Sequence, residues 1–95
     1  MARHAPQIFT YTKDIARIEA LIQRLPTGAR VRLLMDSGPA MAGTVTERPT
    51  IQIFENAKGN QGVNAMLRLD VDEVRGDSEY IWLGDVARVE SIDTH

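Results

Sequence analysis

The first chemistry that the residue types suggest is contact with phosphate groups. Lys13, Arg17 and Arg24 are spaced so that in a helix they fall together on one side. A row of ammonium and guanidinium groups on one face can contact the phosphates of a nucleic acid. Such rows are more commonly the solvated outer faces of helices. From sequence alone, both interpretations of this row stay open.

A second candidate chemistry is stacking on aromatic rings. Trp82 is the only tryptophan of the chain, and it lies two residues after Tyr80 and two before Gly84. Such rings hold single-stranded RNA because a base of any kind can stack on them. The alternative, which is the commoner role of large aromatic side chains, is that both rings fill the core or a subunit interface.

Catalytic chemistry finds little support in the sequence. The two histidines, His4 and His95, stand near the chain ends, where segments tend to be mobile, so a positioned imidazole base is not expected. The serines have no nucleophile-elbow motif around them, and the stretch 59–62 lacks the residues of a phosphate loop. The absence of cysteine excludes disulfides, thiolate nucleophiles and cysteine-based zinc sites. We therefore expect no enzyme and no cofactor.

The acidic stretch from Asp70 to Glu79 raises the question of a calcium site. An EF-hand loop that begins at Asp70 requires an oxygen ligand at its fifth position and glycine at its sixth. The chain has Val74 and Arg75 at those positions. We therefore expect a solvated loop with no metal, which would repel phosphate.

The composition is that of one small globular domain, spanning residues 1–95. The chain has a net charge of −2, with 43% hydrophobic and 25% charged residues. No apolar run approaches the roughly 18 residues of a membrane span, and no secretory signal is legible. We expect a cytoplasmic protein without a membrane partner. Cations outnumber carboxylates in residues 1–34, and the reverse holds in residues 70–95, so one face can be basic on an acidic protein.

These candidate residues need a helix and several strands to position them. Apolar residues recur at helical intervals, which predicts a helix over residues 12–25 after an N-terminal extension, residues 1–11. The apolar stripe consists of Ile15, Ile18, Leu21, Ile22 and Leu25. Thr12 is the predicted N-cap, and Pro26 with Gly28 ends the helix.

After Gly28 the apolar period changes to two, which indicates strands. The predicted strands are residues 29–35, 41–48, 50–55, 65–71, 80–83 and 86–92. The polar, glycine-rich stretch 57–64 is predicted as a loop. Gly38 and Gly84 belong to predicted turns, and Gly43 marks a bend or a close backbone approach within a strand.

This succession predicts an α+β, mainly β fold: one helix, then a small, strongly bent antiparallel sheet or barrel over residues 28–92. So small a sheet leaves edge strands that can pair with a second copy. We therefore expect a homo-oligomer.

The order of these elements resembles the Sm-like family, which includes the Sm and LSm proteins and the bacterial host-factor RNA chaperone. The first Sm motif combines glycines and aliphatic residues, and GARVRLLMDSGPAMAGTV has similar residues in similar places: Gly28, Val31, Leu33, Gly38, Gly43 and Val45. The second motif resembles the run from Ile81 to Val89. The resemblance covers about residues 13–92 and suggests a small proteobacterial variant of the family. It implies an N-terminal helix and a five-stranded bent antiparallel sheet, the Sm-like small barrel.

The resemblance also implies RNA binding, although this chain departs from the usual pattern. In RNA-binding Sm proteins an asparagine after the first motif contacts the base, whereas the stretch 46–52 has no Asp or Asn and offers the amide of Gln52. The arginine before the glycine of the second motif is replaced by Leu83. These departures favour a dimer over a six- or seven-membered ring.

Two functions therefore stay open. The first is a non-enzymatic module that self-associates and binds RNA. Its expected contact residues are Arg30, Arg32, Lys13, Arg17, Arg24, Gln52 and Trp82. The second is an Sm-like fold without RNA binding, which acts as a protein-interaction or assembly module.

Overall fold

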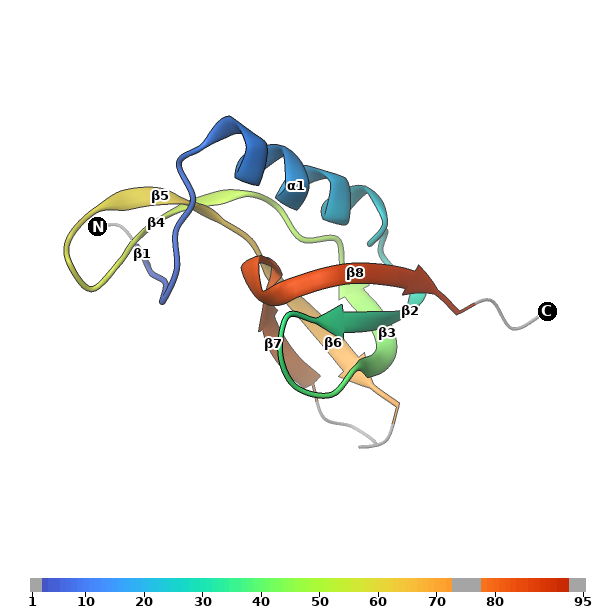
Figure 1. Cartoon of the computed structure of the whole chain (residues 1–95). Coiled ribbons are helices and arrows are strands. Elements are labelled where there is room, and N and C mark those ends of the chain that lie inside the picture. The colour runs from blue at the N-terminus through green and yellow to red at the C-terminus, as the bar shows by residue number, and fades with distance from the viewer. Residues whose placement is uncertain (1–2, 73–77, 93–95) are drawn as a thin grey trace.

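The computed structural model describes residues 3–72 and 78–92 of the chain. In chain order the elements are β1 (Arg3–His4), α1 (Thr12–Gln23), β2 (Arg30–Met35), β3 (Met41–Glu47), β4 (Gln52–Glu55), β5 (Gln61–Asn64), β6 (Met66–Val71), β7 (Ser78–Trp82), the 3-10 turn η1 (Leu83–Asp85) and β8 (Val86–Ser91). Figure 1 shows α1 along the top of the molecule, the β4–β5 hairpin reaching out to one side, and the other large strands gathered below the helix.

Helix α1 is amphipathic, as its apolar spacing predicts. Ile18, Leu21 and Ile22 are buried and belong to the core. The helix differs from the prediction at both ends, because Thr12 is already helical, Tyr11 is the N-cap without a side-chain hydrogen bond, and the last helical residue is Gln23. The apolar pattern extends past the end of the helix because Leu25, which follows it, is also buried. No helix of the described residues is long and apolar enough to cross a membrane.

Five strands form one antiparallel sheet in the order β7-β6-β3-β2-β8. Alternate residues of these strands are buried in the core, among them Val31, Leu33, Val45, Leu67, Leu69 and Val89. The pairing register shifts within β2, between Leu34 and Met35, and within β3, between Val45 and Glu47. Such irregularities bend a strand and increase its twist. The prediction of a mainly β, α+β fold with a bent five-stranded antiparallel sheet is confirmed.

Two of the glycines singled out in the sequence lie where chain segments approach closely. A Cβ atom on Gly43 would overlap the backbone carbonyl of Asp70, which lies on the neighbouring strand β6. A Cβ atom on Gly84 would lie 2.7 Å from the Phe9 ring. Gly28 and Gly38 are instead turn residues with positive φ, at 86° and 89°.

The stretch 57–64 is not a loop throughout, because its last four residues form strand β5. Strand β5 pairs antiparallel with β4, from Gln52↔Asn64 to Glu55↔Gln61. Strands β3 to β6 thus form one long hairpin, interrupted at residues 48–51 on one arm and at Ala65 on the other. The polar sequence of β5 does not predict a strand. Its extended conformation depends on pairing with β4 rather than on side-chain propensity. The prediction of a loop was wrong here.

Residues 3–9 wrap around this hairpin, and we name them the N-terminal strap. On one side β1 pairs parallel with β4, and with it forms the second, three-stranded sheet β1-β4-β5. On the other side Phe9 and Val63 exchange two backbone hydrogen bonds of 2.9 and 2.8 Å. Gly62 lies beneath the crossing, since a Cβ there would be 2.8 Å from the Phe9 carbonyl oxygen. His4, which the sequence placed in a mobile terminal segment, thus lies in a strand that pairs with β4.

Asn64 fastens the strap to the rest of the fold. This side chain is 1% exposed, and it is the buried polar residue of the described core. Its Nδ2 donates to the Gln7 carbonyl oxygen at 3.0 Å. Its Oδ1 accepts from the backbone N–H groups of Ala65, at 2.8 Å, and Gly84, at 3.2 Å. One amide thus connects the strap, strand β5 and the turn η1.

Candidate functional site

The two aromatic residues of β7 lie on the outer face of the five-stranded sheet, away from the core. Tyr80 is 63% exposed. Trp82 is half-buried, and its ring meets the ring of Phe54 edge to face, with centroids 5.1 Å apart. Neither Tyr80 nor Trp82 is part of the core cluster. Their exposure leaves them available to a ligand or to a partner molecule.

A groove runs past both rings, between the three-stranded sheet and the end of the five-stranded sheet. It consists of two adjoining hollows. The Trp82 hollow, of about 240 Å³, is lined by Arg3, His4, Gln52, Phe54, Met66 and Trp82. The Tyr80 hollow, of about 320 Å³, includes Glu47, Arg48, Arg68 and Tyr80 in its lining, and shares Arg3, Gln52 and Met66 with the first. The structure thus brings together two of the sequence-predicted contact residues, Gln52 and Trp82.

The polar groups of the groove are oriented by hydrogen bonds. Arg3 Nη1 donates to Gln52 Oε1 at 2.9 Å, and Gln52 Nε2 lies 3.4 Å from Thr50 Oγ1. Arg68 Nε donates to Ser78 Oγ at 3.2 Å, and that hydroxyl donates to Asp70 at 2.7 Å. The remaining N–H groups of both guanidinium groups can still donate to a ligand.

Three arginines of the groove, Arg3, Arg48 and Arg68, make no ion pair with any carboxylate of residues 3–72 and 78–92. Glu47 is the carboxylate that shares the Tyr80 hollow with them. Cations outnumber anions in the groove lining, so the groove favours an anionic ligand. Arginine is well suited to this task because its planar fork binds phosphate oxygens in pairs.

Arg30 and Arg32, which the sequence suggested as RNA contacts, are each paired with a carboxylate. Arg30 lies 2.6 Å from Asp72, and Arg32 lies 2.9 Å from Glu90. Glu90 also pairs with Arg88, at 3.2 Å. The hydrogen bond from Arg32, together with the attraction of both arginines, lowers the pKa of the Glu90 carboxyl. A phosphate group would have to compete with these carboxylates for Arg30 and Arg32.

The Glu90 pairing predicts a pH dependence of stability in acid. The pKa of this carboxyl is lower in the folded chain. Its stabilising effect is therefore complete above the ordinary glutamate pKa of about 4.5, and is lost as the pH falls through the folded value. In urea titrations followed by circular dichroism, E90Q should unfold more easily than the native chain at pH 7, and the gap should narrow at pH 3. A gap that is constant with pH contradicts this assignment.

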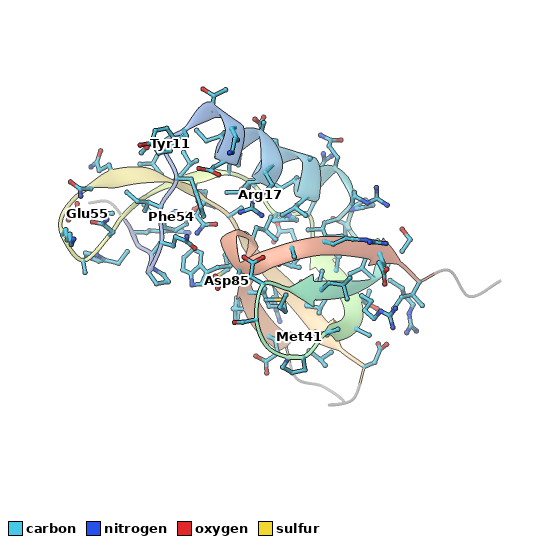
Figure 2. All side chains as sticks on the ribbon, viewed as in Figure 1. Tyr11, Arg17, Met41, Phe54, Glu55 and Asp85 are labelled. Carbon is cyan, nitrogen blue, oxygen red and sulfur yellow. The ribbon has the colours of Figure 1, made fainter. Side chains whose placement is uncertain are left out.

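The predicted row of helix cations does not form one uniform face. Lys13 and Arg24 are exposed. Arg17 instead extends from α1 toward the turn that carries Asp85, as Figure 2 shows. It donates to the carbonyl oxygens of Val86, at 3.1 Å, and Gly84, at 3.4 Å. Its guanidinium also lies 5.8 Å from the centroid of the Phe9 ring. Arg17 therefore contacts both the turn η1 and the N-terminal strap.

The turn of the second motif is covered by the chain itself. Leu83, which stands where the Sm motif has arginine, is fully buried. Gly84 is buried beneath the Phe9 ring and donates its backbone N–H to Asn64. The exposed residue of this turn is Asp85, a carboxylate that repels phosphate, in contrast to the cationic groove.

A larger hollow, of about 420 Å³, lies between α1 and residues 48–51. It contains no aromatic ring, and its one arginine, Arg48, is accompanied by Glu19. Stacking and a surplus of positive charge are both missing there. We therefore place the candidate site in the groove and not in this larger hollow.

The residues considered for metal binding or catalysis are dispersed or engaged. Asp70 accepts from Ser78, and Asp72 pairs with Arg30. The residues Glu73, Val74, Arg75 and Asp77 of the calcium hypothesis, and His95, lie outside the described residues. Within the part of the chain that the structure describes, no group of three His, Cys, Asp or Glu side chains is placed to hold a metal ion.

Comparison with known proteins identifies the family. The matching family model is described as a domain of unknown function, DUF3247, and it spans residues 2–92. The chain belongs to this family. It is also similar to a crystal structure of XC5848 from Xanthomonas campestris, described as adopting a novel variant of the Sm-like motif. The identity is 32%, the match covers 98% of this chain and 100% of that chain, and the TM-score is 0.91. No curated protein matches the chain.

These similarities confirm the resemblance to the Sm-like family, in a divergent variant. They establish the fold of this DUF3247 member and leave its ligand to be argued from the groove. Among the groove residues that the sequence did not single out are Arg3, Arg48, Phe54, Met66 and Arg68. Met66 and Arg68 had a signal, because they alternate with the buried Leu67 and Leu69 on one predicted strand. No sequence pattern pointed to Arg3, because it reaches the groove only through the path of the N-terminal strap.

Proposed function

We propose that this chain is a non-enzymatic Sm-like module that binds single-stranded RNA in the groove and self-associates. The observation that carries the proposal is the combination of Trp82 and Tyr80 with three arginines that have no carboxylate partner among the described residues. The proposed setting, the cytoplasm, rests on the sequence expectation.

The two kinds of group supply the two interactions that single-stranded nucleic acid requires. Rings on which bases stack contribute about 1–3 kcal/mol per base, whatever the base. Arginines that follow the backbone contribute an electrostatic attraction that is independent of sequence. A groove with both features holds a single strand better than a duplex, because the bases of a duplex are already stacked on one another.

The proposal predicts a marked salt dependence of RNA binding. A fluorescein-labelled hexauridylate should bind at 50 mM salt and dissociate as salt is raised, because phosphate contacts release counterions. For three phosphate contacts, the logarithm of the association constant should fall against the logarithm of salt with a slope of about −2, at about −0.7 per contact on a single strand. Fluorescence anisotropy measures this slope. Absence of binding at low salt would refute the proposed function.

Self-association is proposed through the outer edges of the five-stranded sheet. Strands β7 and β8 stand at the two ends of its strand order, and each pairs with one strand of the described chain. Unpaired edge groups of this kind can take up a strand from a second copy. We propose a dimer, and light scattering on a sizing column should give about twice the 10.6 kDa of one chain. A monomer at micromolar concentration would count against it.

The second candidate is a protein-interaction or assembly module that does not bind RNA. The buried Leu83, the covered Gly84 and the carboxylate-paired Arg30 and Arg32 favour it, because they remove contacts expected from the Sm resemblance. Under this alternative the assembly forms as above, and its mass is unchanged when hexauridylate is added at 50 mM salt. Under the first proposal the assembly takes up the RNA.

A further inference from the structure

The groove has two compartments, and each contains one ring from β7. Trp82 lines one hollow and Tyr80 lines the other, while Arg3, Gln52 and Met66 line both. We infer that the groove holds two consecutive nucleotides, with one base on Trp82 and the next on Tyr80. The inference rests on the proposed RNA binding and specifies the size of that site.

The spacing of the two rings supports one base on each ring. Tyr80 and Trp82 are two residues apart on one strand and on the same face, which places their Cα atoms about 7 Å apart. Stacked nucleotides rise about 3.4 Å per residue along a strand. Two neighbouring bases that reach both rings must therefore separate from each other. Proteins that bind single strands commonly hold bases unstacked in this way, on aromatic side chains.

Each ring has its own neighbour on strand β6. In the register of the sheet Met66 lies opposite Trp82, and Arg68 lies opposite Tyr80. The Trp82 hollow therefore combines aromatic and thioether surface with the amide of Gln52, which can hydrogen-bond a base edge. The Tyr80 hollow combines its ring with Arg48 and Arg68. Beside the ring that each hollow contributes for one base, this difference adds a base-edge contact in the first hollow and phosphate contacts in the second.

Arg3 is placed to contact the phosphate between the two nucleotides. It lines both hollows, and one of its nitrogens is engaged by Gln52 Oε1. A guanidinium group has five N–H donors, so most of them are available to a phosphate. The single shared arginine thus lies at the junction of two base sites, where a two-nucleotide ligand has its linking phosphate.

The test compares two ligands with the same number of phosphates, in competition against labelled hexauridylate. Uridine 3′,5′-bisphosphate has one base, and 5′-phosphorylated diuridylate has two. The dinucleotide should bind at least about tenfold more tightly, because a second base gains a stacking partner. Extension to the trinucleotide should add less than about threefold. Tyr80→Ala should remove the gain from one base to two, and because Tyr80 is exposed its loss should not unfold the chain.

Tyr11→Ala is the matched control. Tyr11 is 76% exposed at the start of α1, and it lines neither hollow (Figure 2). This variant should retain the native preference for the dinucleotide. If hexauridylate binds but one base binds as well as two, or if Tyr80→Ala leaves the dinucleotide gain intact, the two-nucleotide site is wrong while RNA binding stands. If hexauridylate does not bind, the proposed function itself fails.

Discussion

Replacement of Arg3, Arg48 and Arg68 together by glutamate is expected to lower the affinity for hexauridylate about 100-fold or more at 50 mM salt. The change converts the surplus of positive charge in the groove into repulsion of phosphate. All three side chains are exposed, and none makes an ion pair with another described residue. The fold should therefore survive, which circular dichroism can verify. Fluorescence anisotropy gives the affinity.

A matched control changes the net charge equally at other places. Lys13 and Arg24, on α1, and Lys58, at the tip of the β4–β5 hairpin, are exposed and lie outside the groove. Their joint replacement by glutamate should weaken binding less than about fivefold, through the long-range field alone. If this control variant loses more affinity than the groove variant, the phosphates lie along the helix and the groove assignment is wrong.

The second large effect is expected from Asn64→Ala, on stability. The substitution leaves the backbone N–H groups of Ala65 and Gly84 and the carbonyl of Gln7 without their partner. A buried group that loses its partner costs about 1–3 kcal/mol, so we expect the free energy of unfolding to fall by about 3 kcal/mol. Urea denaturation followed by circular dichroism measures it. RNA binding should weaken as well, because the strap that carries Arg3 loses one of its attachments, the hydrogen bond from Asn64 to Gln7.

Asn56→Ala is the matched control, which shows whether the loss of stability depends on the burial of the hydrogen bonds or only on their number. Asn56 Oδ1 also accepts two backbone N–H groups, those of Lys58 and Asn60, both at 3.0 Å. These bonds lie in an exposed hairpin turn, where water can replace the lost acceptor. This variant should cost about 1 kcal/mol or less. Equal losses in the two variants would show that Asn64 does not have the connecting role described above.

The core elements were predictable because their residues follow simple periods. The helical stripe that includes Ile18 and Leu21, and the alternation of Val31, Leu33 and Val45, identify the buried faces of α1, β2 and β3. Strand β5 was missed because Gln61 and Gly62 have neither strand propensity nor an apolar alternation. Its pairing with β4 and the strap is a tertiary interaction that a local pattern does not contain.

The site was predictable only in part, for the same reason. Trp82 and Gln52 stand out by residue type and motif position, and the structure places both in one hollow. Arg3 is 49 positions away from Gln52 in sequence. It reaches that hollow only because residues 3–9 wrap around the hairpin. Conversely, Arg30 and Arg32 were singled out by charge, but charge along the chain does not reveal their pairing with Asp72 and Glu90 across the sheet.

The most direct test of the groove uses the emission of Trp82. Because the chain has one tryptophan, its fluorescence reports on this hollow alone. Titration of the native chain with hexauridylate at 50 mM salt should quench the emission in a saturable manner, and added salt should restore it. The groove variant of Arg3, Arg48 and Arg68 should show no quenching over the same range. Emission that stays constant, while anisotropy of the labelled RNA reports binding, would place the RNA elsewhere and contradict the account.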